Sequence, residues 1–314
     1  MGRRSILLSN FRGKTESYIR PNMIESFSKV AVIGAGTMGN GIAHVFAQHG
    51  YDVHLIDMSP EALERGLVNI ARNMDRQIKK GIITETQKQE ALGRVTTSTA
   101  ITGSVRDRDL VIEAATENIE IKKNIFREMD ANAPEHCILA TNTSSISITE
   151  LGAVTSRSGQ VIGMHFMNPV PMMKLVEVIN GYDTTEAVTA DILKISEDLG
   201  KVPVSVHDYP GFVANRILMP MINEAIYTLY EGVAGVEEID TVMKLGMAHP
   251  MGPLQLADFI GLDVCLAILH VLHDGFGNPK YAPCPLLKNM VTAGHLGKKS
   301  GRGFYTYEQG KVFR

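Results

Sequence analysis

The stretch that decides the fold is "KVAVIGAGTMGNGIAHVFAQHGYDVHLID", residues 29–57. A short apolar strand leads into a glycine-rich turn, a helical pattern follows and ends at Gly50, and a second apolar strand closes the stretch. The turn has the G-x-G-x-x-G spacing. Its first glycine permits a tight turn, its second admits a pyrophosphate to the backbone, and its third allows close packing of helix on strand. The predicted cofactor-binding residues of this turn are Gly34, Gly36, Thr37, Met38 and Gly39.

An acidic residue closes the second strand and indicates which dinucleotide binds. Asp57 lies 21 residues after Gly36, where the ribose-binding carboxylate of a dinucleotide fold belongs. A carboxylate there accepts hydrogen bonds from the ribose hydroxyls and repels a 2′-phosphate. The next residues, "MSP" at 58–60, include no arginine to offset that repulsion. The sequence therefore predicts NAD(H) rather than NADP(H).

Strand and helix patterns keep alternating beyond this stretch. Apolar strands are expected at 94–99, 109–114 and 137–142, with a helix over 120–132 before the last of them. Such βαβ alternation predicts a Rossmann-type α/β domain, a mostly parallel sheet covered by helices.

An insertion at 59–93 separates the second strand from the third. Apolar residues recur at helical spacing up to Ile78, Gly81 ends that pattern, and Thr84 with Gln87 forms a capping box for a second helix. We expect a helical hairpin. Basic side chains gather near its tip, namely Arg72, Arg76, Lys79 and Lys80.

Two strands, "QVIGMHF" at 160–166 and "KLVEVI" at 174–179, are joined only by "MNPVPMM". Seven residues are too few for a crossover helix, so the pair is expected to be antiparallel. A turn centred near Pro171 places His165 directly or nearly opposite Glu177, with Cβ atoms about 5 Å apart. From the residues alone, two interpretations stay open. The two side chains form either a buried pair that satisfies itself or a general base with its orienting carboxylate.

Polar residues follow two of the strands at the sheet edge where doubly wound folds bind ligands. Glu117 follows the strand at 109–114, and Ser144 lies in "ATNTSS" at 140–145. Asn215 lies in "GFVANR", at the start of the first helix of the next domain. Serines of this loop equally suit a helix cap, and Asn215 a surface or cap position.

After "DYPG" at 208–211 the strand patterns give way to helical ones at 212–232, 236–246 and 253–277. The predicted domains are an N-terminal extension over 1–27, a nucleotide-binding domain over 28–208, and an all-α domain over 209–314. The long apolar run near residues 254–272 is broken by charged residues, so we expect a buried helix and no membrane contact.

The net charge and the cysteine pattern of the chain argue against several other kinds of protein. A formal net charge of −3 gives no electrostatic reason to expect a nucleic-acid partner. Three scattered cysteines without a CxxC pair predict neither disulfides nor a metal site, and favour a reducing compartment. The arginine- and serine-rich residues 1–27 suit either an upstream extension or a transit peptide. We expect a cytoplasmic location, or the mitochondrial matrix if they are a transit peptide.

Five motifs together carry a family resemblance: "GAGTMG", "NTSS", "HFMNPVPMMKLVEVI", "GFVANR" and "HPMGPLQLADFIGLD". They resemble the NAD-dependent 3-hydroxyacyl-CoA dehydrogenases, most of all the bacterial short-chain 3-hydroxybutyryl-CoA dehydrogenases, over about Lys29 to Tyr307. A C-terminal "GKKSGRGFY" at 297–305 also matches the family, although by composition it is only a flexible basic loop.

The resemblance implies a role for each matching residue. His165 would be the general base that takes the 3-hydroxyl proton, Glu177 would pair with it, and Ser144 and Asn215 would bind the substrate oxygen. The implied NAD contacts are Glu117, Lys122, Asn168 and Lys299, and the implied coenzyme A contacts are Asn73 and Lys80. Lys80 equally suits a solvated helix end. The resemblance also implies an acyl-CoA substrate and a homodimer formed through the all-α domain.

Two other functions stay open. A β-hydroxyacid dehydrogenase acting on a free acid shares the Rossmann start, but such enzymes typically rely on a catalytic lysine, which the His165–Glu177 hairpin disfavours. A non-catalytic NAD-binding or structural protein on the same scaffold is the second alternative. The presence of Ser144, His165, Glu177 and Asn215 together argues against it.

Overall fold

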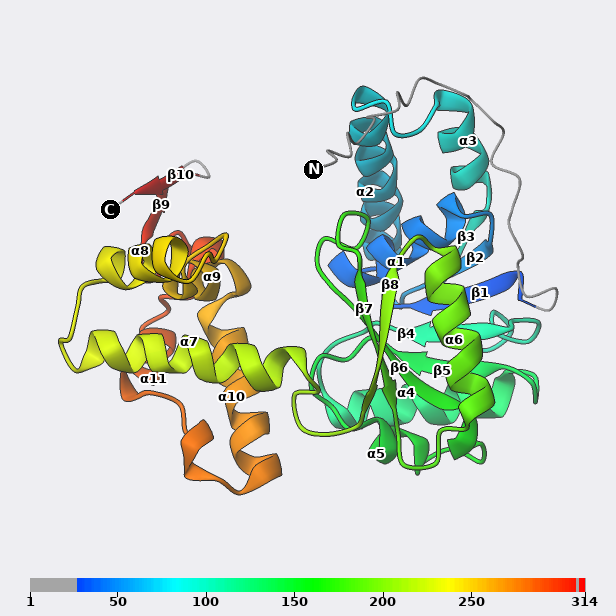
Figure 1. The fold of residues 1–314 in the computed structure, drawn as a ribbon. Coiled ribbons are helices and arrows are strands. Elements are labelled where there is room, and N and C mark those ends of the chain that lie inside the picture. The colour runs from blue at the N-terminus through cyan, green and yellow to red at the C-terminus, as the bar shows by residue number, and fades with distance from the viewer. Residues whose placement is uncertain (1–26, 309–310, 314) are drawn as a thin grey trace, which may run out of the picture.

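The computed structural model describes residues 27–308 and 311–313, which form a sheet-containing domain and a helical domain side by side (Figure 1). One eight-stranded sheet has the order β3-β2-β1-β4-β5-β6-β7-β8. Its strands are β1 (Lys29–Ile33), β2 (Asp52–Ile56), β3 (Val95–Ser98), β4 (Leu110–Glu113), β5 (Ile138–Thr141), β6 (Val161–Phe166), β7 (Leu175–Asn180) and β8 (Val202–His207). All neighbours pair in parallel except β6 and β7, which confirms the predicted antiparallel pair.

Helices cover both faces of the sheet. They are α1 (Thr37–Gln48), α2 (Pro60–Lys79), α3 (Glu85–Gly93), α4 (Ile119–Asn132), α5 (Ile148–Gly152) and α6 (Glu186–Asp198). Alternate residues of β1 point to opposite faces. Val30 and Val32 pack with α1, α2, α3 and α6, whereas Ala31 and Ile33 pack with α4 and α5. The predicted Rossmann-type domain is confirmed.

The insertion after β2 is the predicted helical hairpin, formed by α2 and α3, and it rises beside α1 in Figure 1. Gly81 adopts φ +68° at the turn, a conformation that favours glycine. The Thr84 hydroxyl accepts the Gln87 N–H, and the Gln87 side chain accepts the Thr84 N–H. Both hydrogen bonds of the predicted capping box are therefore formed.

The helical domain contains α7 (Ala214–Tyr230), α8 (Val236–Gly246), α9 (Pro253–Ile260), α10 (Leu262–Phe276) and α11 (Pro285–Thr292). The prediction of one helix over 253–277 is wrong, because α9 and α10 are separate and meet at 97°. Gly261 joins them with φ +107°, which breaks the helical hydrogen-bond ladder. Of the helices that the structure describes, only this bent pair taken together is long and apolar enough to span a membrane, and no single one is.

The domain is not purely α-helical, because β9 (Thr306–Glu308) and β10 (Lys311–Phe313) form a short antiparallel hairpin. The segment before it is not the free basic loop that its composition suggests. Buried Asp258 accepts the N–H groups of Phe304 and Tyr305 and the hydroxyl of Tyr307. A Cβ at Gly303 would lie 1.9 Å from that carboxylate, so the glycine is required for the close approach.

Of the predicted N-terminal extension, only Phe27 lies within the described residues, and it is buried in the core of the sheet-containing domain. Residues 1–26 lie outside the described part of the chain, so the extension stays a prediction. The last strand of the sheet, β8, ends at His207, and the first helix of the helical domain, α7, begins at Ala214; the domain boundary at residues 208–209 stays a prediction.

Candidate active site

The glycine-rich turn has the geometry that a dinucleotide site needs. Gly34 adopts φ +103° between β1 and α1. A Cβ at Gly39 would lie 1.7 Å from the Gly34 carbonyl oxygen, so the helix packs directly on the turn. Apart from its own neighbours in the chain, no atom of the described residues lies within 4 Å of the place that a Cβ on Gly36 would occupy. The backbone there is open to a ligand at the N-terminus of α1, where anions bind favourably.

Asp57 binds the glycine-rich turn. One carboxylate oxygen accepts the Ala35 N–H at 2.8 Å, and the other accepts the Ser59 N–H at 2.9 Å. The carboxylate therefore lies directly beside the turn, at the carboxyl end of β2. This is the position predicted for a group that accepts hydrogen bonds from a ribose.

The central pair of the site is His165 and Glu177, which are direct partners in the β6–β7 ladder. The predicted juxtaposition is confirmed. The imidazole Nδ1 lies 2.8 Å from Glu177 Oε2, and both side chains are buried. If Nδ1 carries the proton that Glu177 accepts, the neutral ring has Nε2 free to take a proton.

Glu177 has further partners outside the sheet. Its Oε1 accepts the N–H groups of Val213, at 3.2 Å, and Ala214, at 3.0 Å, at the start of α7. Burial opposes ionisation of this carboxyl, but the hydrogen bonds from His165 and from these two N–H groups hold its pKa below the ordinary glutamate value. Glu177 is therefore a carboxylate at neutral pH, and it can accept a hydrogen bond from the imidazole.

The loop after β5 is held by Glu117. A single carboxylate oxygen accepts the Thr143 hydroxyl at 2.5 Å, the Ser144 N–H at 3.0 Å and the Ser145 hydroxyl at 3.2 Å. The Asn215 amide donates to the Ser144 carbonyl at 2.9 Å. The backbone of Ser144 is thus fixed on both sides, and its loop lies against the first turn of α7.

Lys122 is almost completely buried in α4, and its ammonium donates to both oxygens of Glu113, at 2.7 and 2.8 Å. Its Nζ also lies 3.4 Å from Glu117 Oε2. Glu113 is itself fully buried and accepts the Ala115 N–H and the Thr141 hydroxyl. Lys122, predicted from the resemblance as an NAD contact, is therefore engaged in a buried ion pair that supports the Glu117 loop.

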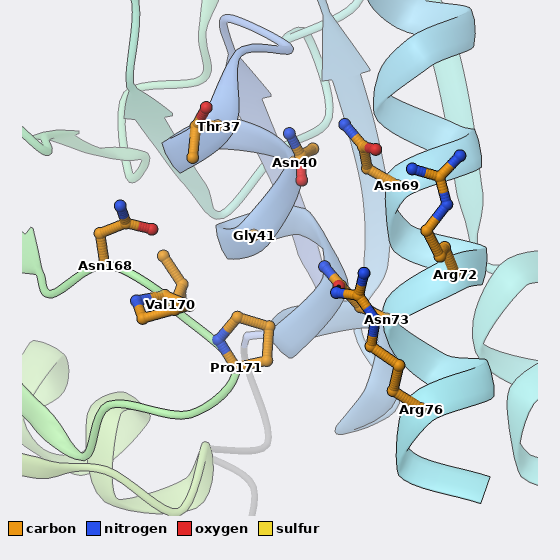
Figure 2. Close-up of a pocket in the computed structure, with 11 residues that line it drawn as sticks. Thr37, Asn40, Gly41, Asn69, Arg72, Asn73, Arg76, Asn168, Val170 and Pro171 are labelled. Carbon is orange, nitrogen blue, oxygen red and sulfur yellow. The ribbon is translucent and has the colours of Figure 1, made fainter. Parts of the chain in front are cut away.

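A cavity of about 180 Å³ lies between α1, α2 and the loop that joins β6 to β7 (Figure 2). It brings three predicted residues together, Thr37, Asn73 and Asn168. Figure 2 shows Arg72 and Arg76 of α2 on the side opposite Asn168. Two guanidinium groups and several amides make a lining suited to phosphate groups.

Comparison with known proteins shows the family of the chain. Residues 29–209 match the model of the 3-hydroxyacyl-CoA dehydrogenase NAD-binding domain, and residues 211–307 match that of the 3-hydroxyacyl-CoA dehydrogenase C-terminal domain. The chain belongs to the 3-hydroxyacyl-CoA dehydrogenase family. It is accordingly an NAD-dependent oxidoreductase, which confirms the predicted cofactor and enzyme class.

Relatives within the family are similar over nearly the whole chain. A 3-hydroxybutyryl-CoA dehydrogenase of Bradyrhizobium diazoefficiens is 53% identical over 92% of this chain and 98% of its own length. One of Clostridioides difficile is 50% identical over 90% of this chain and its full length. The crystal structure of an (S)-3-hydroxybutyryl-CoA dehydrogenase from Ralstonia eutropha superposes with a TM-score of 0.88, at 51% identity, and covers 90% of this chain and all of the other.

Like most of the predicted site residues, Met38, Lys80 and Lys299 lie outside the cavity lining. Met38 is half-buried and packs against the core. Lys80 is exposed at the C-terminal end of α2, which also suits the solvated helix end. Lys299 forms an ion pair with Asp263 in the helical domain, with oxygen–nitrogen distances of 2.6 Å.

Sequence reasoning missed two residues that shape the site of this dehydrogenase. Glu113 could have been noticed as a single carboxylate at the end of an apolar strand, "DLVIEA". Lys201 gave no such signal. Its ammonium donates to the carbonyls of Val170 and Met173, at 2.5 and 2.8 Å, and so holds the β6–β7 loop that lines the cavity. Burial lowers the pKa of Lys201.

Proposed function

We propose that this chain catalyses the reversible NAD-dependent oxidation of (S)-3-hydroxybutyryl-CoA to acetoacetyl-CoA, with His165 as the general base. The buried hydrogen bond between His165 and Glu177 carries the proposal, because it fixes the orientation of the imidazole that acts as the base. The substrate is inferred from the relatives of 50–53% identity that are named as 3-hydroxybutyryl-CoA dehydrogenases.

The proton transfer follows from the state of this pair. With Nδ1–H donated to Glu177, Nε2 of His165 accepts the proton of the 3-hydroxyl group as the substrate is oxidised. The Glu177 carboxylate then stabilises the imidazolium that forms. In the reverse direction the same imidazolium returns its proton to the 3-oxygen. Bound NAD⁺ would supply the hydride acceptor for this chemistry.

Ser144 and Asn215 are proposed to bind the substrate oxygen at the reacting carbon. Glu117 and Asn215 fix the backbone on either side of Ser144. A hydroxyl on a loop held in this way is preorganised, so it loses little freedom when the substrate binds. Hydrogen bonds to the oxygen strengthen as charge develops on it in the transition state.

The residues around the glycine-rich turn fit NAD. We assign the pyrophosphate to the backbone of Gly34–Gly39 and the N-terminus of α1, and the ribose to Asp57. Glu117, Asn168 and Lys299 are proposed as further contacts. We assign Lys122 to a supporting position, because both Glu113 oxygens already accept its ammonium protons.

Coenzyme A is proposed to bind along α2. Asn73 and Arg76 of that helix lie at the cavity, and Lys80 follows one turn later on the exposed end. These donors suit the phosphates of coenzyme A, which a free hydroxy acid lacks. This lining therefore favours a thioester of coenzyme A over a free acid.

The substrate class is tested by the rate of NADH oxidation with acetoacetyl-CoA and with free acetoacetate. We expect turnover on the thioester to exceed that on the acid by at least about 10³-fold, because the acid forgoes the binding energy of the coenzyme A moiety. Rates with C6, C8 and C10 3-ketoacyl-CoAs, measured in the same assay, define the chain-length preference. Equal kcat/KM for acetoacetate would favour the free-acid alternative.

A homodimer is proposed through the helical domain. Exposed apolar side chains gather on and after α8, with Val242, Leu245 and Met247 each at least 60% exposed. Contiguous apolar surface of this kind marks interfaces. Light scattering at micromolar concentration should give twice the mass of the chain, and Leu245→Glu should reduce it. A monomeric mass for the parent protein would contradict the proposal.

The cytoplasmic location stays a prediction. It depends on the nature of residues 1–27, nearly all of which lie outside the described part of the chain.

A further inference from the structure

The carboxylate of Glu177 makes hydrogen bonds to both domains. Its Oε2 lies at hydrogen-bond distance, 2.8 Å, from His165 Nδ1 within the sheet, and its Oε1 accepts hydrogen bonds from the backbone N–H groups of Val213 and Ala214. These two N–H groups open α7, a helix of 17 residues that lies in the helical domain. Glu177 therefore caps this helix, although it lies 36 residues before Val213 and 37 residues before Ala214 in the sequence.

The two residues just before the first turn of α7 are held in a fixed conformation. Gly211 and Phe212 adopt φ +73° and +48° just before α7, and a Cβ at Gly211 would lie 2.6 Å from Leu272 Cδ2. Phe212 is buried, with its ring centroid 6.1 Å from that of His165. At the second residue of the helix, the Asn215 side-chain amide donates a hydrogen bond to the Ser144 carbonyl. In Figure 1, α7 runs from this junction into the helical domain.

A carboxylate with one bonded oxygen can rotate about its last side-chain torsion, whose energy wells are broad. Bonds to both oxygens remove that freedom, and with it the range of positions that Oε2 can occupy relative to the imidazole. The partial positive charge at the N-terminus of α7 also keeps Glu177 ionised. Both effects act on His165 through Glu177.

We propose that the first turn of α7 is a positioning element for the catalytic base, so that the His165–Glu177 pair is complete only when the helical domain is docked on the sheet. The groups that act are the backbone N–H groups of Val213 and Ala214. This inference rests on the proposed function, because it assumes that His165 is the base. It adds that the helical domain contributes backbone groups to the orientation of that base.

The test replaces single amides by esters in the full-length protein, by incorporation of the α-hydroxy analogue of the residue. An ester at Ala214 removes the N–H that Glu177 accepts and keeps the side chain. We expect kcat for acetoacetyl-CoA reduction to fall about tenfold, as the loss of one hydrogen bond to a charged group predicts, with KM within twofold. An ester at Val213, whose bond is longer, should lower kcat less.

An ester at Ile217 is the matched control. Its N–H donates to the Val213 carbonyl within the same helix, at 3.2 Å, and its side chain is exposed. This ester costs α7 one backbone hydrogen bond without touching Glu177, so kcat should stay within twofold of the parent value. An equal loss of kcat at Ile217 and Ala214 would show that only helix stability matters, and would overturn the proposal.

A second measurement tests the state of the His165–Glu177 pair directly. ¹⁵N NMR of labelled histidine should show His165 protonated at Nδ1 in the parent protein and a mixture of tautomers in the Ala214 ester. An unchanged His165 spectrum together with unchanged kcat would overturn the inference. A His165→Gln variant in the same series keeps the two proposals distinct, because full turnover in that variant refutes the base assignment, whatever the esters do.

Discussion

Replacing His165 by alanine is expected to lower kcat for acetoacetyl-CoA reduction by about 10²–10⁴-fold, the usual contribution of a general acid or base. The proton on the imidazole is the one that the 3-oxygen receives in this direction, and water in its place is neither oriented nor paired with Glu177. NADH affinity, measured by fluorescence titration, should change little, because His165 lies on β6 and the glycine-rich turn lies between β1 and α1.

Two further variants sharpen this result. Glu177→Gln keeps the shape of the orienting group but removes its charge, so kcat should fall by less than in His165→Ala. His136→Gln is the matched control, since this exposed histidine precedes β5 and lies 3.4 Å from Asp109. Its kcat should stay within twofold of the parent value. A His165→Ala enzyme with near-normal turnover would refute the assignment of the base.

The position of the base could be predicted from the sequence because the length of the connection in a hairpin limits which residues of its two strands can face each other. A connection of seven residues between two apolar strands leaves little choice of register, so His165 and Glu177 were expected at or near opposite positions, and they are direct partners. The glycine spacing and the capping box at Thr84 were equally predictable, because each depends on residues close together in the chain. Such local rules account for most of the sheet-containing domain.

Contacts that join distant segments could not be predicted in this way. Periodicity shows that "DLVIEA" is a buried strand but does not reveal that Glu113 meets Lys122 of the following helix. The bond from Glu177 to the start of α7 spans two domains and uses backbone N–H groups, which carry no sequence signal. The break at Gly261 was missed because an apolar pattern runs through it. In each case the tertiary arrangement, rather than local propensity, decides the structure.

The second large effect is expected at Lys122, where the resemblance implies a cofactor contact and the structure shows a buried ion pair. Lys122→Met should lower the free energy of unfolding by about 3–5 kcal/mol, since it leaves the Glu113 carboxylate buried and without its counter-charge. Urea unfolding curves of the NAD-free protein measure this effect. Lys123→Met is the matched control, because Lys123 pairs with the exposed carboxylates of Glu120 and Glu150. This substitution should lower the free energy of unfolding by less than about 1 kcal/mol.

The double variant Glu113→Gln/Lys122→Met separates the two roles of the lysine. A glutamine can still accept the Ala115 N–H and the Thr141 hydroxyl, and it carries no charge that needs a partner. Stability should therefore recover by at least about half of the loss in the single variant, a coupling that only directly interacting residues show. If Lys122→Met instead keeps its stability and loses NADH affinity, the lysine acts on the cofactor. If both fall and the double variant restores stability alone, the buried pair holds the fold while the same ammonium, 3.4 Å from Glu117, also sets the cofactor-binding loop.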